Sequence, residues 1–167
     1  MDVRALCAPG FAAAATALFA GCASYDAVQP GQSMADVERR LSAPSDKRSG
    51  AGGGEVWEYN LQPLGRRTWM VTFGADGKVA RVEQVMHADH FRKLRDGEST
   101  RDDVLRMLGK PGSRHSYSRL GEEVWDYGFY LDTWSMLLSV HFDAASGRLK
   151  YYATMPDPAV YTLRAFM

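Results

Sequence analysis

Hydrophobic and polar residues follow a pattern that occurs twice along the chain. The sequence EVWEY at residues 55–59 returns as EVWDY at residues 123–127, an offset of 68. Further landmarks return in the same order at offsets of 67 to 70: Val37, Leu41, Pro44, Phe73 and Gly77 recur as Val104, Leu108, Pro111, Phe142 and Gly147. Landmarks in one order at a nearly constant offset predict two copies of a single module.

A short helix is predicted at the start of each module. Ser33 and Asp36 have the spacing of a helix N-cap and an acidic first turn. Val37 and Leu41 are four residues apart and share a helical face, and Pro44 ends the helix. The second copy repeats this arrangement from residue 99 to Pro111. Helices of about ten residues are unstable alone, so we expect both to pack against strands.

Strands are predicted after each helix because aromatic residues alternate there with mostly polar ones. Trp57, Tyr59 and Leu61 alternate with Val56, Glu58 and Asn60, and Trp125, Tyr127 and Phe129 alternate with Val124, Asp126 and Gly128. Further strands are expected around Val71 and Val140, and over residues 79–85 and 149–153. The predicted fold is α+β, with two tandem modules that each pack a helix on one face of an antiparallel sheet.

The pattern divides the chain into segments. They are a signal peptide (1–21), an N-terminal tether (22–29), the first module (30–86), a helical linker (87–95), the second module (96–156) and a tail (157–167). Residues on the helix-facing side should form the core. The predicted core residues are Val37, Leu41, Trp57, Tyr59, Phe73, Val104, Leu108, Trp125, Tyr127 and Phe142.

An apolar stretch from Ala5 to Ala20 precedes the modules. It is interrupted at Pro9-Gly10 and is too short for a transmembrane helix, so a signal peptide is predicted. The stretch ends Leu18-Phe19-Ala20-Gly21-Cys22, and small residues before a cysteine resemble a bacterial lipobox. Lipidation of Cys22 would anchor the chain, whereas the alternative is an ordinary secretory signal cleaved nearby. Lipoprotein sorting rules then imply the periplasmic face of the outer membrane, because Ala23 follows the cysteine.

Composition excludes several classes of function. The chain has 167 residues with 20 basic and 20 acidic side chains, and a chain without net charge is a poor general nucleic-acid binder. It has two cysteines, of which Cys7 would leave with the signal. The predicted mature chain therefore has neither a disulfide nor a cysteine nucleophile, and its fold must rely on its core.

The module resembles the SmpA/OmlA (BamE-like) family of outer-membrane lipoproteins. The resemblance is carried by Gly31, Ser33, Val37, Leu41, Pro44, the Trp57-Glu58-Tyr59 segment, Phe73 and Gly77, and by Leu108-Gly109-Lys110-Pro111 in the second copy. Single-module members of this family belong to the β-barrel assembly machine. The duplication is similar to the tandem fold of β-lactamase inhibitor proteins, in which two units join into one concave sheet that grips a partner.

Partner contacts are expected on the sheet face that the helix leaves uncovered. Seven residues are candidates for this face: Glu58, Asn60, Met70, Asp126, Tyr130, His141 and Tyr152. We expect no catalytic centre, because the acidic pairs at 102–103 and 122–123 lie at element starts. His87 and His90 have helical spacing but lack a third ligand, so neither a metal nor another cofactor is expected.

The sequence thus predicts a non-enzymatic, lipid-anchored protein that binds other envelope proteins. Outer-membrane protein assembly or envelope integrity is the expected role, with the β-barrel assembly machine as the expected partner. An inhibitor-like module that binds a periplasmic enzyme through its concave sheet is the alternative.

Overall fold

The computed structural model describes residues 24–160, so Cys22 and the predicted signal peptide lie outside the described residues. Two four-stranded antiparallel sheets form, with strand orders β1-β2-β3-β4 and β5-β6-β7-β8. The fold is therefore α+β and contains two modules of the same plan, as predicted. No helix in the described range is long and apolar enough to cross a membrane.

The first module contains α1 and the first sheet. Its elements are α1 (Met34–Leu41), β1 (Asp46–Ser49), β2 (Glu55–Asn60), β3 (Thr68–Phe73) and β4 (Val79–Gln84). The second module repeats this order after a short linker helix, α2 (Ala88–Phe91). Its elements are α3 (Arg101–Leu108), β5 (Ser113–Tyr117), β6 (Glu122–Leu131), β7 (Trp134–Asp143) and β8 (Leu149–Pro156). Short 3-10 turns occur at Tyr25–Ala27, Ala51–Gly53 and Ser118–Leu120.

Both module helices begin with the same capping box. The Ser33 hydroxyl accepts a hydrogen bond from the Asp36 N–H, and the Asp36 carboxylate accepts one from the Ser33 N–H. Thr100 and Asp103 make the same reciprocal pair in α3. Each box satisfies backbone N–H groups that the first helical turn cannot pair internally. The predicted helix starts are confirmed in both copies.

The tryptophan environments also repeat from one module to the other. Trp57 packs at a tilt on Phe73 with ring centroids 4.7 Å apart, and Trp125 packs on Phe142 at 4.8 Å. Both indole N–H groups donate to a glutamate two residues earlier in the strand. A cation lies over each ring, Lys47 over Trp57 and Arg114 over Trp125. The repeat predicted from the sequence thus extends to side-chain contacts. All ten predicted core residues are buried.

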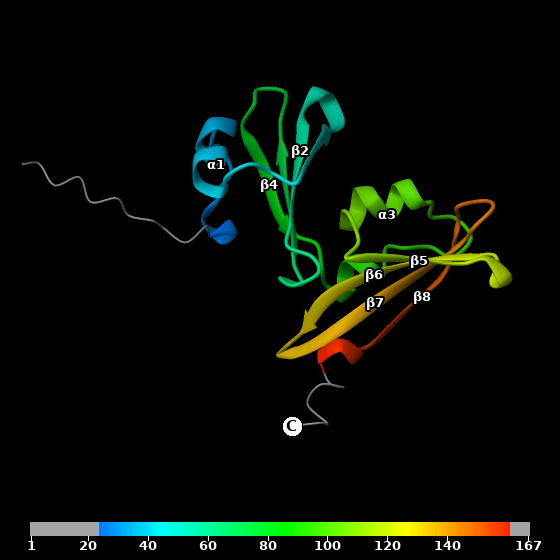
Figure 1. The fold of residues 1–167 in the computed structure, drawn as a ribbon. Coiled ribbons are helices and arrows are strands. Elements are labelled where there is room, and N and C mark those ends of the chain that lie inside the picture. Colours follow the sequence, from blue (N-terminus) through cyan, green and yellow to red (C-terminus); the bar gives the residue numbers. More distant parts are fainter. Residues whose placement is uncertain (1–23, 161–167) are drawn as a thin grey trace, which may run out of the picture.

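Four layers stack in the order α1, first sheet, α3, second sheet (Figure 1). One core lies between α1 and the first sheet and contains Val37, Trp57 and Phe73. The other core contains Val104 and Leu108 of α3, the inner side of the second sheet, and Met70 from the first sheet. The helix α3 therefore lies between two sheets, whereas α1 covers only one.

The two sheets remain separate and are not joined by strand pairing. The single continuous concave sheet implied by the resemblance to β-lactamase inhibitor proteins is therefore not present. Instead, α3 packs on the second sheet through Val104 and Leu108, and its C-terminal end and Lys110 contact the first sheet. Leu105 and Met107 are partly buried hydrophobic residues of α3 and pack against the second core.

Candidate functional site

The face of the first sheet opposite α1 is partly occupied by the C-terminal end of α3 and the segment that follows it. This face, the outer face of the first sheet, carries Arg48, Glu58, Asn60 and Met70. One Arg48 guanidinium nitrogen donates to the Leu105 carbonyl oxygen at 2.9 Å and therefore binds the C-terminal end of α3. The Leu105 carbonyl also accepts the Gly109 N–H, and a second Arg48 nitrogen lies 3.5 Å from the Arg106 carbonyl oxygen, so the guanidinium lies at the negative end of the helix dipole.

Glu58 holds the backbone just after α3. Its Oε1 atom accepts a hydrogen bond from the Lys110 N–H at 2.9 Å, and its Oε2 atom lies 3.7 Å from the Arg48 guanidinium. Asn60 donates to the Lys110 carbonyl oxygen at 2.6 Å. Glu58 is only 1% exposed, which is exceptional for a carboxylate and requires such partners. A carbon added at Gly109 would lie 2.5 Å from this carboxylate.

Three of the seven predicted partner residues therefore serve an intramolecular contact. Glu58 and Met70 are buried, and Asn60 is hydrogen-bonded to the second module. They lie on the face opposite α1, as the strand alternation predicted. The sequence pattern did not reveal that the second module's own helix covers that face.

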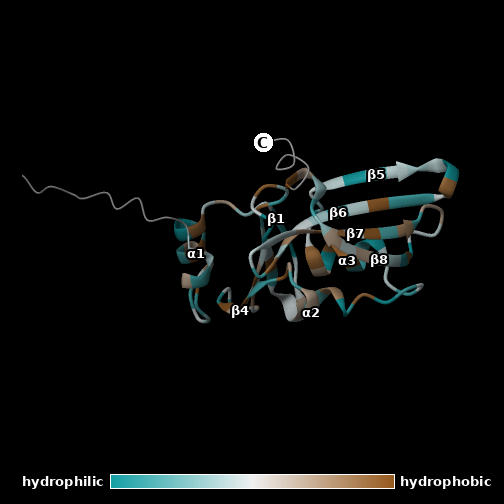
Figure 2. Cartoon of the chain, turned by 90° about the horizontal axis from the view of Figure 1, so that it is seen from below, coloured by the Kyte–Doolittle hydropathy of each residue, from teal (hydrophilic) through white to brown (hydrophobic). Residues whose placement is uncertain are grey.

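None of the helices α1, α2 and α3 covers the equivalent face of the second sheet, and a short helical turn at residues 158–160 lies beside one end of that sheet (Figure 1). This face, the outer face of the second sheet, lies opposite α3. The strand register places six polar or large side chains on it: His115, Tyr117, Asp126, His141, Tyr151 and Met155. Figure 2 shows this sheet with polar and apolar positions intermixed along its strands. Tyr117, Tyr151 and Met155 are each between 43% and 48% exposed. Exposed tyrosine and methionine side chains are typical of protein-binding surfaces.

A histidine–aspartate pair lies at the centre of this face. The His115 ring nitrogen Nε2 is 3.2 Å from an Asp126 carboxylate oxygen. The other Asp126 oxygen accepts a hydrogen bond from the Ser139 hydroxyl at 2.6 Å. The pairings His115 with Val124 and Ser113 with Asp126 set this geometry through the β5–β6 register.

A second charged group lies beside it. The Glu122 carboxylate accepts a hydrogen bond from the Lys150 ammonium group and lies 3.2 Å from His141 Nδ1. The hydrogen bond from Lys150 lowers the pKa of Glu122, and the same bond raises the pKa of Lys150. His141 stacks on Tyr151 with ring centroids 4.3 Å apart. Because both charges are stabilised, this group is suited to binding a polar partner rather than to proton transfer.

Tyr152 is a correction to the predicted site. It pairs with Val140 and packs against the core between α3 and the second sheet, so its predicted face is wrong. A bulge beside Phe142 shifts the β7–β8 register and brings Tyr151 to the outer face instead. A shift of one residue exchanges the two faces of a strand. Asp126, Tyr130 and His141 lie on the outer face as predicted.

The loop between β2 and β3 closes one end of this face. The Gln62 side-chain amide donates to the Gly128 carbonyl oxygen at 2.6 Å and accepts the Gly128 N–H at 2.9 Å. It therefore pairs with the β6 backbone as a residue of a neighbouring strand would. Arg66 lies against Gly128 and forms an ion pair with Asp157 at 2.5 Å. A side chain at position 128 would collide with Arg66, because its Cβ atom would lie 2.9 Å from a guanidinium nitrogen. The open part of the face therefore begins at Asp126.

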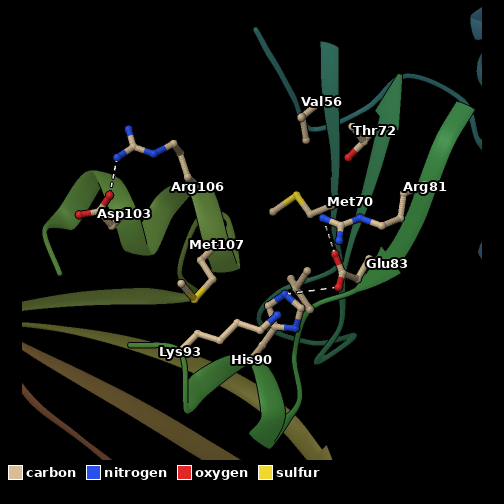
Figure 3. Close-up of a pocket in the computed structure, with 11 residues that line it drawn as sticks. Val56, Met70, Thr72, Arg81, Glu83, His90, Lys93, Asp103, Arg106 and Met107 are labelled. Atoms are coloured by element: carbon tan, nitrogen blue, oxygen red, sulfur yellow. Dashed lines mark hydrogen bonds and ion pairs between the residues drawn. The ribbon is translucent and has the colours of Figure 1, made fainter. Parts of the chain in front are cut away.

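A cleft of about 370 Å³ lies between the modules and is the principal alternative site (Figure 3). Glu83 pairs with Arg81 at 3.0 Å and with His90 at 3.7 Å, and Asp103 pairs with Arg106 at 2.5 Å. Every acid that lines the cleft thus has a basic partner. Burial lowers the pKa of His90, and the Thr100 hydroxyl lowers the pKa of Asp103 to about 2. A carboxylate with so low a pKa is a poor general base.

The described residues contain no group of three or more histidine, cysteine, aspartate or glutamate side chains placed to hold a metal ion. His87 and His90 approach each other, with ring nitrogens 3.1 Å apart. His90 is buried beneath the first sheet rather than solvated in the linker.

The sequence pattern did not place His115, Tyr117 or Tyr151 on the predicted partner-binding face. A signal for His115 was available in the repeat, because the offset of 67 residues aligns it with Arg48. Its neighbour Asp126 aligns with Glu58 at an offset of 68.

Comparison with known proteins assigns no family. No protein-family model matches the chain, and no curated protein matches it. The solved structures similar to it include an extracellular protein containing an SCP domain from Bacillus anthracis. It is 14% identical, with 98% of this chain and 53% of that chain covered and a TM-score of 0.30, so this chain spans about half of that protein's length.

Two further solved structures are similar to the chain. One is a DUF4309 family protein, YjgB, from Bacillus subtilis, with 14% identity, 75% of this chain and 78% of that chain covered, and a TM-score of 0.27. The other is a protein from Streptococcus mutans assigned provisionally as a beta-lactamase inhibitor protein. It is 15% identical, with 79% of this chain and 87% of that chain covered and a TM-score of 0.29. Likenesses of this strength leave the function to be argued from the chain itself.

Proposed function

We propose that this chain is a lipid-anchored envelope protein that binds other proteins through the outer face of its second sheet. The observation that carries the proposal is the asymmetry of the two modules. The C-terminal end of α3 and the segment after it occupy part of the outer face of the first sheet, whereas the equivalent face of the second sheet lacks such a contact within the described residues and carries exposed Tyr117, Tyr151 and Met155.

The outer face of the second sheet would gain contact area and lose no charge pairing when a partner covers it. Tyrosine and methionine side chains provide large contact areas, and the ion pairs around Asp126 and Glu122 orient them. Both carboxylates are only 12% to 16% exposed and already have partners. A partner can cover them without leaving an unpaired charge in the interface.

The proposed location rests on the sequence before the described residues. The segment that ends at Cys22 supports lipidation, and acyl chains would then hold the modules at the periplasmic face of the outer membrane. The proposed role is outer-membrane protein assembly or envelope integrity, with assembly-machine subunits as partners. Cys22→Ala should move the protein from the membrane fraction to the soluble fraction. Unchanged fractionation of that variant would contradict the anchor.

Protein binding is tested separately from anchoring. Tyr151→Ser and Met155→Ser should reduce the recovery of envelope proteins in pull-downs from detergent-solubilised cells. The matched control is Glu38→Ser on α1, which lies at the other end of the stack and should leave recovery unchanged. Equal recovery by all three variants would contradict the assignment of this face.

An enzyme inhibitor remains a second candidate because of one local feature. The turn Ser118–Leu120 follows β5 at a free end of the second sheet (Figure 1), and Leu120 is 67% exposed there. An exposed turn beside a rigid sheet has the shape to enter an enzyme's cleft. Nanomolar inhibition of a periplasmic hydrolase, abolished by Leu120→Asp, would favour this candidate over the assembly role.

A further inference from the structure

The interface between the modules is a template for the open face of the second sheet. On the first sheet, Arg48 and Glu58 bind the C-terminal end of α3 and the N–H group that follows it. The corresponding positions of the second sheet hold a pair of the same polarity, His115 and Asp126, 3.2 Å apart. Register places both pairs alike, because Arg48 lies opposite Val56 and His115 lies opposite Val124.

We infer that the outer face of the second sheet receives an α-helix of a partner protein, in the position that α3 takes on the first sheet. This inference rests on the proposed protein-binding function and specifies the chemistry of the partner. The last carbonyl groups of the partner helix lie at His115, and a backbone N–H group just beyond the helix donates to Asp126. Apolar side chains of that helix contact Val124 and Tyr151.

The chemistry of the two pairs supports this placement. A histidine protonated on both ring nitrogens, like a guanidinium group, can face a carboxylate with one N–H and donate the other to a carbonyl oxygen at a helix end, so the placement uses the imidazolium form of His115. A carboxylate accepts a backbone N–H group, as Glu58 does from Lys110. Asp126 is partly exposed, whereas Glu58 is covered, so the pair on the second sheet is accessible.

A second copy of this chain does not fit the role. In a head-to-tail stack, α1 of the second copy would occupy the face. The α3 positions Leu105 and Met107, which are partly buried and pack against the core that includes Met70, correspond in α1 to Glu38 and Arg40. These charged residues are exposed, and Glu38 pairs with Lys47. Burying these two charged side chains would remove them from water, which disfavours a head-to-tail stack through α1 and favours a helix from another protein.

The probe for this inference is a peptide of residues 99–112, which contains α3 and the segment that Glu58 binds. Its helix is too short to persist alone, so a hydrocarbon staple joins positions 102 and 106, which are exposed in the chain. Binding of the labelled peptide to the detergent-solubilised full chain is measured by fluorescence anisotropy.

His115→Arg recreates the pair of the first sheet and should tighten peptide binding about two- to fivefold, the effect of a fixed cation at a helix C-terminus. Asp126→Asn should weaken binding about tenfold, because a hydrogen bond to a charged acceptor is lost. The control Lys78→Ala removes an exposed cation at the β3–β4 turn and should change nothing. Unchanged affinity in both His115→Arg and Asp126→Asn would overturn the inference.

Other occupants give different results. Dimerisation in sedimentation experiments that is lost in His115→Glu would overturn the inference in favour of a second copy. A tenfold gain in peptide affinity after deletion of residues 161–167 would overturn it in favour of this chain's own tail. If the peptide fails to bind but Tyr151→Ser still reduces pull-down recovery, the helix is wrong while the proposed function stands.

Discussion

Replacing Arg48 by methionine should separate the two modules energetically. The substitution keeps most of the side-chain length and removes the donor that binds the Leu105 carbonyl oxygen. It also removes the cation that pairs with the Glu58 carboxylate, and within the described residues the Glu58 Oε2 atom has no hydrogen-bond donor to replace it. The final turn of α3 and a buried charge would lose their partner together.

The expected cost follows from burial. Removal of one member of a buried ion pair costs about 3–5 kcal/mol, because the remaining charge stays out of water. Arg48 is partly exposed and lies 3.7 Å from Glu58, so the lower part of that range applies. We expect a loss of about 3 kcal/mol in the free energy of unfolding, a large part of the stability of a typical domain.

Urea-induced unfolding, followed by tryptophan fluorescence, measures this loss. The repeat supplies the matched control, because His115→Met makes the same change at the equivalent but exposed position and should cost at most about 0.5 kcal/mol. The double variant Arg48→Met/Glu58→Gln removes the buried charge but keeps an acceptor for the Lys110 N–H, so it should recover most of the loss. Equal costs below about 1 kcal/mol for Arg48→Met and His115→Met would refute the reasoning.

Three further predictions concern helix ends and one buried ring. Thr100→Ala should cost about 1 kcal/mol through loss of the cap and should raise the pKa of Asp103 from about 2, measured by carboxyl NMR titration. Because the pKa of Asp103 is lower in the folded chain than in the unfolded chain, its ionised carboxylate stabilises the fold above about pH 4. This contribution is lost as the pH falls toward 2, so the free energy of unfolding of Thr100→Ala should fall less between pH 4 and pH 2 than that of the parent chain. Ser42 has φ 65° and ψ −166°, a conformation that glycine adopts readily and other residues adopt at a cost. Ser42→Gly should therefore stabilise the fold by about 1 kcal/mol, measured as a higher thermal midpoint. Burial lowers the pKa of His90, so stability should fall as the pH drops below about 6.5, and His90→Gln should reduce that dependence in urea unfolding measured across this range.

Much of each module followed from local patterns. The aromatic alternation around Trp57 and Trp125 identified the helix-facing side of both sheets, because a strand's period of two is set by its backbone. The capping boxes were likewise visible as short spacings. Repetition strengthened both predictions, since each copy served as a test of the other.

The arrangement of the modules did not follow from these patterns. Glu58 and Met70 have the alternation of an exposed face, and only the position of α3 buries them. A trace of that arrangement exists in the sequence, because α3 has Leu105 and Met107 where α1 has Glu38 and Arg40. A helix with apolar residues on two sides packs between two layers. Tyr152 was misplaced for a different reason, the bulge that shifts β8 by one residue.

The central claim is that the open face of the second sheet, rather than α1, meets a protein partner in the envelope. Site-specific photo-crosslinking in intact cells tests it most directly, with a photoreactive side chain at Tyr151 or, as the matched position, at Glu38. We predict that Tyr151 yields a defined adduct with an envelope protein, and that the crosslinked residues lie in the last turn of a helix. The account would be contradicted if Glu38 gave that adduct and Tyr151 did not.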